Sequence, residues 1–152
     1  MIIHLASDHA GFELKRVITA HLQTAGHTVV DHGALDYNPN DDYPGFCLAA
    51  AHAVAAEPGS LGIVIGGSGN GEQVVANKVR GVRAALTWST RTARLARQHN
   101  DANVMGLGAR EHTAADALAI VDAFTTEPFG HDERHQRRID QISAIEAEGS
   151  LE

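Results

Sequence analysis

The sequence predicts an α/β fold in which a five-stranded, mainly parallel sheet is covered by helices on both faces, a three-layer α/β/α sandwich. Short apolar runs rich in β-branched residues alternate along the chain with longer segments of helical periodicity. The run 60–66, SLGIVIG, is apolar throughout, as expected of a strand buried on both faces. The 152 residues contain no repeat, linker or low-complexity segment, so we expect a single domain over 1–152.

Each expected strand is a short apolar segment. The strands are residues 1–7, 27–31, 60–66, 82–88 and 102–108. The stretch from 31 to 45, DHGALDYNPNDDYPG, is polar and rich in turn-forming residues, so we expect a loop before the second helix.

Six helices are expected between and after these strands. Their ends carry recognisable signals: Gly26 as a C-terminal stop, Pro44 in a first turn, Ser89 or Thr90 as an N-cap, and Thr113 at another N-terminus. The helices span roughly residues 11–26, 44–56, 70–79, 90–99, 113–124 and 131–148, the last followed by a frayed acidic tail.

Composition narrows the class of protein. The formal net charge of −7 argues against a nucleic-acid-binding surface. The single cysteine, Cys47, excludes an internal disulfide framework, and we expect it to be a core side chain rather than a nucleophile. The N-terminal segment has neither the basic nor the long apolar region of a signal peptide, and no apolar run approaches about 20 residues. We therefore expect a cytoplasmic protein with no membrane partner.

Polar segments follow three of the strands, where ligands bind in open α/β sheets. They are SDH at 7–9, GGSGNGE at 66–72 and GAR at 108–110. A fourth polar segment, HND at 99–101, follows a helix and precedes the fifth strand, so the same rule does not place it.

The glycine-rich segment suits an anion. Four glycines stand within the six residues from Gly66 to Gly71, and they allow backbone N–H groups to approach a ligand at the start of a helix. The dinucleotide pattern G-x-G-x-x-G and the phosphate-loop pattern G-x-x-x-x-G-K-[ST] are both absent. The third possibility is an oxyanion hole.

Glu72 favours the oxyanion hole, because a carboxylate repels a bound phosphate but is suited to removing a proton. An enediolate formed over the loop would be stabilised by the same N–H groups and by the Ser68 hydroxyl. The alternative is a tight strand-to-helix turn in which Glu72 is an ordinary acid of the first helical turn.

Two further pairs have alternative interpretations. Asp8 and His9 can bind sugar hydroxyls or move protons, or Asp8 can simply cap the next helix. His99, with Asn100 beside it, is a candidate general acid or base, or a cation at the negative end of a helix.

The arginines suit a phosphate group. Arg134 and Arg138 are spaced i, i+4 with Arg137 nearby, and Arg110 directly follows a strand. The alternative for the last helix is a solvated charged face. The same helix carries a narrow apolar stripe that could pack on a partner subunit, formed by Ile139, Ile142 and Ile145.

We expect no metal site. His131 and His135 are spaced i, i+4, but the H-E-x-x-H pattern and a cysteine cluster are absent. A calcium loop is suggested by Asp36, Asn38, Asp41 and Asp42, but the glycine and the closing glutamate of an EF-hand are missing.

Taken together, these segments resemble the RpiB/LacAB sugar-phosphate isomerase family over nearly the whole chain. The matching segments are ASDHAGFELK, DYP, GGSGNGEQ, ANKVRGVRAAL, HND, GLGAR and RHQRRI. The resemblance implies a Rossmann-like sandwich that forms a homodimer or a tetramer, with active sites made by two subunits. It also implies the ribose 5-phosphate isomerase reaction of the pentose phosphate pathway, through a cis-enediol(ate) and without a metal or other cofactor.

Two alternatives stay open at this point. One is the same chemistry on another sugar phosphate, such as a tetrose 4-phosphate, another pentose phosphate, or galactose or allose 6-phosphate. The other is a non-catalytic anion- or nucleotide-binding module.

The resemblance also implies roles for individual residues. Glu72 is the base, His99 helps to open the furanose ring and Ser68 is a hydroxyl partner of the enediolate. The implied substrate contacts are Asp8, His9, Tyr43, Gly67, Gly69, Asn70, Gly71 and Asn100. The implied phosphate ligands are Arg110, Arg134 and Arg138, the last two expected across the dimer.

One departure separates this chain from part of the family, which has a cysteine base at the position of Gly66. Cys47 lies in a different expected element and does not replace that cysteine. The sequence GGSGNGE resembles the branch that uses a glutamate instead. An ordinary glutamate is ionised at pH 7, and partial burial would raise its pKa and its basicity.

Overall fold

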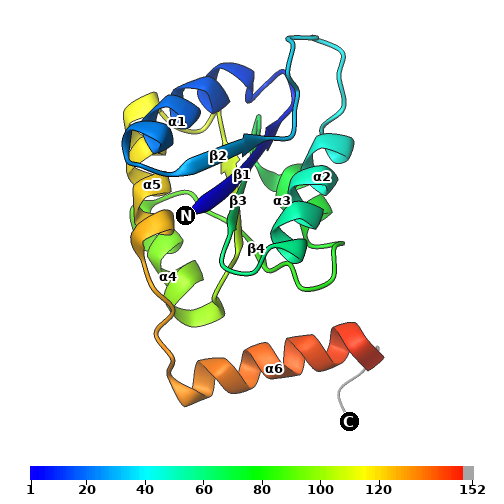
Figure 1. Ribbon diagram of the computed structural model, residues 1–152, viewed down its shortest axis with the longest axis vertical. Helices are drawn as coiled ribbons and strands as arrows, with labels where there is room; N and C mark the ends of the chain where they lie inside the picture. Colours follow the sequence, from blue (N-terminus) through cyan, green and yellow to red (C-terminus); the bar gives the residue numbers. More distant parts are fainter. Residues whose placement is uncertain (149–152) are drawn as a thin grey trace.

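Five parallel strands form one sheet in the order β2-β1-β3-β5-β4 (Figure 1). The computed structural model describes residues 1–148, and the frayed tail expected at the end of the chain lies outside these residues. The strands are β1 (Ile2–Ser7), β2 (Thr28–Asp31), β3 (Leu61–Gly66), β4 (Ala84–Leu86) and β5 (Val104–Gly108). The predicted α/β class is confirmed, and the sheet is parallel throughout.

Helices cover both faces of the sheet (Figure 1). One layer consists of α1 (Phe12–Thr24), α4 (Thr90–Asn100) and α5 (Ala114–Thr126), and the other of α2 (Tyr43–Ala56) and α3 (Asn70–Ala76). Successive residues of a strand point to opposite faces. In β3, Ile63 and Ile65 join the core beneath the first layer, while Val64 joins the core beneath the second.

Most helix ends are where the sequence signals place them. Ser89 caps α4 by accepting from the Thr92 backbone N–H, and Thr113 caps α5. α3 is shorter than expected, because after Ala76 the chain continues in tighter i→i+3 turns. The Asn77 side chain then bonds both the N–H and the carbonyl of Ala84, at the start of β4.

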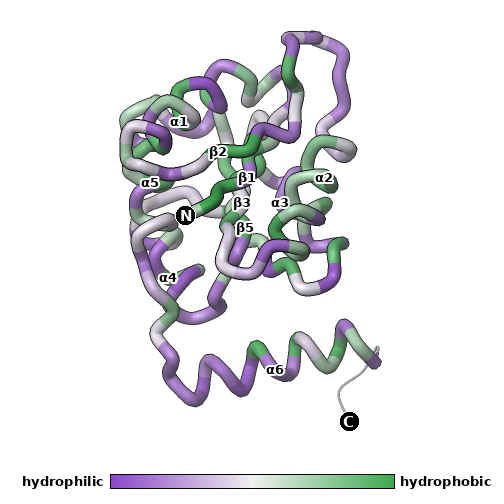
Figure 2. Tube along the Cα trace, viewed as in Figure 1, coloured by the Kyte–Doolittle hydropathy of each residue, from purple (hydrophilic) through white to green (hydrophobic). Residues whose placement is uncertain are grey.

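The C-terminal helix α6 (Glu133–Glu148) lies outside both helical layers, across one end of the sandwich (Figure 1). It is mostly hydrophilic, with a few separated apolar positions (Figure 2). His135 and Ile139 are buried against the body, whereas Ile142 and Ile145 are exposed. Packing of α6 on a partner subunit therefore stays a prediction. Within residues 1–148, no helix has both the length and the apolar character required to cross a bilayer.

The strand order places a crevice between β1 and β3. The chain leaves β1 toward β2 on one side, and leaves β3 toward β4 and β5 on the other. The loops after β1 and β3 therefore diverge at the carboxyl edge of the sheet, which is the position at which open α/β folds bind ligands.

Candidate active site

The glycine loop after β3 is held against the end of β5. The Ala109 N–H donates to the Gly66 carbonyl at 2.8 Å, and the Arg110 N–H donates to the Gly67 carbonyl at 3.0 Å. Gly69 precedes α3 with φ of 80°, and a Cβ there would lie 2.8 Å from the carbonyl carbon of Leu107. Only glycine fits that conformation and that space.

This loop presents free backbone donors. Among the described residues, the N–H groups of Gly67, Ser68, Gly69 and Gly71 make no hydrogen bond. Consecutive free N–H groups at the start of a helix form an anion-binding site. The arrangement has the donors that an oxyanion hole requires.

The Glu72 carboxylate lies beneath this loop, and the residue is 4% exposed. A Cβ built on Gly66 would overlap this carboxylate, so the acid occupies the space that a side chain at position 66 would need. Burial raises the pKa of Glu72 above its ordinary value, and the negative charge of Asp8 adds to the increase. A buried carboxylate of raised pKa is a stronger base than an exposed one.

Asp8 and His9 follow β1 and are fixed by local hydrogen bonds. Asp8 accepts from the Ala10 N–H at 2.9 Å, and the N-cap of α1 is Gly11 rather than Asp8. His9 is bonded to Asp41, whose Oδ1 accepts from the His9 backbone N–H at 2.9 Å and lies 2.8 Å from Nδ1.

Asp8, His9 and Asp41 are also the group of described residues whose potential ligand atoms lie close enough together to hold a metal ion, all within 4.8 Å. A histidine nitrogen that binds a metal must be unprotonated. Here Nδ1 faces a carboxylate oxygen and is therefore the protonated nitrogen. The arrangement favours a hydrogen-bonded pair over a metal centre.

These groups line one cleft of about 450 Å³ at the carboxyl edge of the sheet. Tyr43, at the start of α2, packs its hydroxyl against Gly71, and Arg110 lies over Gly67 with Nη1 3.4 Å from where a Cβ would be. The cleft is lined by Asp8, His9, Ala10, Tyr43, Gly67, Ser68, Gly71, Glu72, Arg110 and Glu111. The structure thus brings together the predicted residues that follow β1, β3 and β5.

Ser68 is at the edge of the cleft, with Asn70 beside it. Asn70 donates to the Ser68 Oγ from its backbone N–H at 3.3 Å and from its side chain at 3.1 Å. Because that oxygen already accepts, its own O–H remains available to donate to a ligand. The Asn70 side chain lines an adjacent hollow beside Trp88 rather than the cleft itself.

The remaining predicted residues lie elsewhere. His99 and Asn100 end α4, which leads into the start of β5, whereas Glu72 lies at the other end of the strands. The five residues of β5 separate the two ends by roughly 15 Å. Arg134 and Arg138 are exposed on α6, and Arg134 lines the same shallow hollow as His99. One small ligand in the cleft of a single chain does not reach this second group.

The second group is held firmly within the chain. The rings of His99 and His135 stack with centroids 4.2 Å apart and an interplanar angle of 14°. Burial, followed by the proximity of His99, lowers the pKa of His135. Arg134 lies 3.4 Å from the Asp132 carboxylate.

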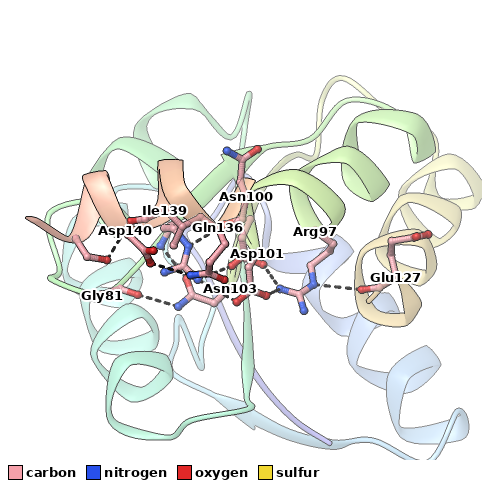
Figure 3. Close-up of polar contacts among 12 residues, drawn as sticks. Gly81, Arg97, Asn100, Asp101, Asn103, Glu127, Gln136, Ile139 and Asp140 are labelled. Atoms are coloured by element: carbon pink, nitrogen blue, oxygen red, sulfur yellow. Dashed lines mark hydrogen bonds and ion pairs between the residues drawn. The ribbon is translucent and has the colours of Figure 1, made fainter. Parts of the chain in front are cut away.

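A polar network fixes the turn after Asn100 (Figure 3). Asp101 adopts a left-handed conformation with φ of 42°, and its carboxylate accepts from Arg97 at 2.8 Å and from Arg83 at 3.1 Å. The same two arginines line a cavity of about 530 Å³ at the amino ends of the strands. Since their guanidinium groups are already paired, we assign this network to the fold rather than to ligand binding.

Cys47 is buried in α2 beneath the cleft. Burial raises the pKa of its thiol to about 12, and the charges of Glu72 and Asp8 contribute. The sequence-based expectation of a core residue rather than a nucleophile agrees with this environment.

Three residues in or beside the cleft were not predicted as site residues from the sequence: Ala10, Glu111 and Asp41. Ala10 and Glu111 line the cleft, and Asp41 bonds to His9. Ala10 and Glu111 are direct neighbours of His9 and Arg110, so adjacency was a usable signal. Asp41 comes from the long polar loop, whose path the sequence pattern does not give.

Comparison with known proteins gives consistent matches over almost the whole chain. The profile of the Ribose/Galactose Isomerase family matches residues 3–142. Ribose-5-phosphate isomerase B of Mycolicibacterium paratuberculosis is 60% identical over 146 residues, covering 96% of this chain and 92% of that protein. The Escherichia coli protein of the same name is 40% identical over 144 residues, 95% of each chain. Ribose-5-phosphate isomerase B of Mycoplasma genitalium, solved with bound ribulose-5-phosphate, has a TM-score of 0.93 at 46% identity, covering 97% of both chains.

Proposed function

The chain belongs to the Ribose/Galactose Isomerase family, and from this we propose that it is an enzyme that interconverts ribose 5-phosphate and ribulose 5-phosphate. The observation that carries the proposal is the buried Glu72 carboxylate beneath a loop of free N–H donors. Such a pair suits a reaction that removes a proton from carbon and develops negative charge on an adjacent oxygen.

In the proposed reaction, Glu72 removes the proton from C2 of the open-chain aldose. The electrons of the C2–H bond form a C1–C2 double bond, and the carbonyl electrons move onto O1. The loop N–H groups and the Ser68 hydroxyl stabilise the enediolate. Glu72 then returns its proton to C1, while the proton of the O2 hydroxyl passes to O1, so that O1 becomes a hydroxyl and O2 becomes the ketose carbonyl. No redox partner is needed, because the reaction is a balanced internal transfer.

Arg110 is a cation of the cleft, and the hydrogen bond to Asp41 raises the pKa of His9 and so favours its cationic form. We assign both residues to the phosphate or to sugar oxygens. The assignment is supported by charge: Asp8 and Glu72 are both buried nearby, so a phosphate needs these cations to bind. Tyr43 and the glycine loop form the walls against which the sugar chain lies.

The positions of the other family residues support an active site shared by two subunits. His99, Asn100, Arg134 and Arg138 cannot reach the cleft of their own chain. A partner's His99 and Asn100 would open the sugar ring and hold the substrate, and the partner's Arg134 and Arg138 would bind the phosphate. The exposed Ile142 and Ile145 on α6 offer apolar surface for such a dimer.

A coupled assay of ribulose 5-phosphate formation from ribose 5-phosphate, in excess EDTA, tests the function. Turnover of the pentose phosphate should exceed that of tetrose 4-phosphates and of galactose and allose 6-phosphates. Turnover of a hexose phosphate alone would show that the protein is an isomerase of the same family with a different substrate. Absence of turnover with all of them, from folded protein, would refute the proposal.

Glu72→Gln tests the assigned base. It should lower kcat by about 10²- to 10⁴-fold with little change in KM, because it removes the base and keeps the shape. Glu111→Gln, at the exposed rim of the same cleft, is the matched control and should retain turnover. Near-normal kcat in Glu72→Gln would overturn the assignment.

A further inference from the structure

Asp41 is a charged group that the proposed reaction leaves unexplained. Its side chain is 8% exposed, and its Oδ2 is buried without a hydrogen-bond partner among the described residues. Native structures keep few such atoms, because an unpaired buried carboxylate oxygen is costly. A buried acid of this kind beside a cleft calls for a functional explanation.

The other carboxylate oxygen of Asp41, Oδ1, makes both of its hydrogen bonds with His9. Oδ1 accepts from the backbone N–H at 2.9 Å and lies 2.8 Å from Nδ1. One oxygen therefore fixes both the main chain and the ring of the same histidine. Nε2 has no hydrogen-bond partner within residues 1–148, and His9 lines the cleft.

The loop that carries Asp41 is tied to the body of the protein. Lys15, which is buried, donates from Nζ to Asp31 at 2.6 Å and to the Ala34 carbonyl at 2.7 Å. Further along the loop, the backbone N–H of Asp41 donates to the Asn38 carbonyl at 3.1 Å. The loop is thus fixed at its start by Lys15, and Asp41 stands two residues before the start of α2 at Tyr43.

The charges around His9 favour its protonated form. Besides Asp41, the Asp8 carboxylate lies 4.0 Å from Nδ1, and Glu72 and Glu111 line the same cleft, with Arg110 as the opposing cation. The pKa of His9 is raised, chiefly by the hydrogen bond to Asp41 and further by Asp8, against the effects of burial and of Arg110. A protonated ring has an N–H to donate at Nε2 as well.

We propose that Asp41 is a positioning residue, which holds the His9 ring so that Nε2 donates a hydrogen bond to an oxygen of the sugar phosphate. The identity of the ligand rests on the proposed function. The Asp41–His9 pair is a property of the free protein and is testable without substrate.

The test compares Asp41→Asn with Asp42→Asn. Both remove one negative charge, but Asp42 is exposed and makes no side-chain cap to α2. The His9 ring is titrated by NMR in the free protein, with its signal assigned by His9→Gln. We expect the midpoint to move to lower pH in Asp41→Asn and to be unchanged in Asp42→Asn.

Activity provides the second measurement. In the wild type, kcat/KM should fall at high pH as His9 loses its proton, and in Asp41→Asn this fall should move to lower pH. At pH 8, kcat/KM of Asp41→Asn should be lower by about tenfold or more, the effect of losing one charged hydrogen bond. In a His9→Gln background, Asp41→Asn should cause no further loss, because its effect acts through the ring.

An unchanged His9 midpoint in Asp41→Asn, or additive losses in the double variant, would overturn the proposal. If Asp41→Asn fails to fold, the wild-type titration decides: a midpoint at or below that of free histidine would overturn it. A shifted midpoint with no turnover of any sugar phosphate would refute the isomerase function and support the Asp41–His9 pair.

Discussion

The Glu72 carboxylate occupies the space that a Cβ on Gly66 would need. The two positions therefore exclude each other sterically: a side chain at 66 and a glutamate at 72 cannot both adopt their places. With Glu72 as the proposed base, this contact explains how a chain with glycine at the end of β3 can have a carboxylate where other family members have a cysteine at position 66. The acid reaches it from the first turn of α3 instead.

Gly66→Ala is the direct test of this exclusion. The new methyl group should displace Glu72, lower kcat by more than about 100-fold and destabilise the fold by about 1–3 kcal/mol, as overpacking does. Urea unfolding and the coupled assay measure the two effects. Gly45→Ala is the control. Gly45 lies in helix α2, and a Cβ at this position would meet no atom within 4 Å.

In a Glu72→Ala background, the stability cost of Gly66→Ala should shrink, because the overlapping carboxylate is gone. A cost that is the same in both backgrounds would contradict the steric account.

Glu72→Gln should be more stable than the wild type at neutral pH. Folding raises the pKa of Glu72, so the folded state holds this proton more tightly than the unfolded state and is penalised once pH rises above the ordinary carboxyl range. Glutamine carries no charge to bury. We expect a Tm higher by about 2–4 °C at pH 8, the effect of about 1 kcal/mol in a chain of this size.

The gain should disappear below about pH 4, where glutamate is protonated in both states. Thermal melts of wild type and variant across this range measure it. Equal Tm values at pH 8 would show that burial of the charge has no cost.

Cys47 should be unreactive in the native protein. Its pKa of about 12 leaves almost no thiolate at pH 8, and the side chain is buried. Iodoacetamide should therefore label the urea-unfolded chain and spare the folded one. Cys47→Ala should keep kcat within about threefold and cost about 1 kcal/mol of stability. Rapid labelling of folded protein would contradict this account of the thiol.

Local sequence signals were sufficient to predict the strands, the helix caps and the residues that follow β1, β3 and β5. Those features depend on periodicity and on a general rule for parallel sheets. The Asp41–His9 contact was not predictable, because it joins two segments 32 residues apart through a loop whose path has no periodic pattern. The separation of His99 from Glu72 could have been inferred from the strand and helix order, since α4 ends at the opposite edge of the sheet.

Mixing two inactive variants tests whether active sites are shared between subunits. Glu72→Gln lacks the proposed base, and the double variant Arg134→Ala, Arg138→Ala lacks the α6 cations. Each alone should be nearly inactive. If the arginines act across a dimer, a heterodimer has one site with both an intact Glu72 and intact arginines. After subunit exchange of an equal mixture, half of the dimers are mixed, so about one quarter of all sites should be active. Substitution of Arg137 by Ala, a neighbouring exposed arginine, is the control and should keep activity. No recovery in the mixture, with exchange verified by mass spectrometry, would mean that the arginines and Glu72 must come from the same chain.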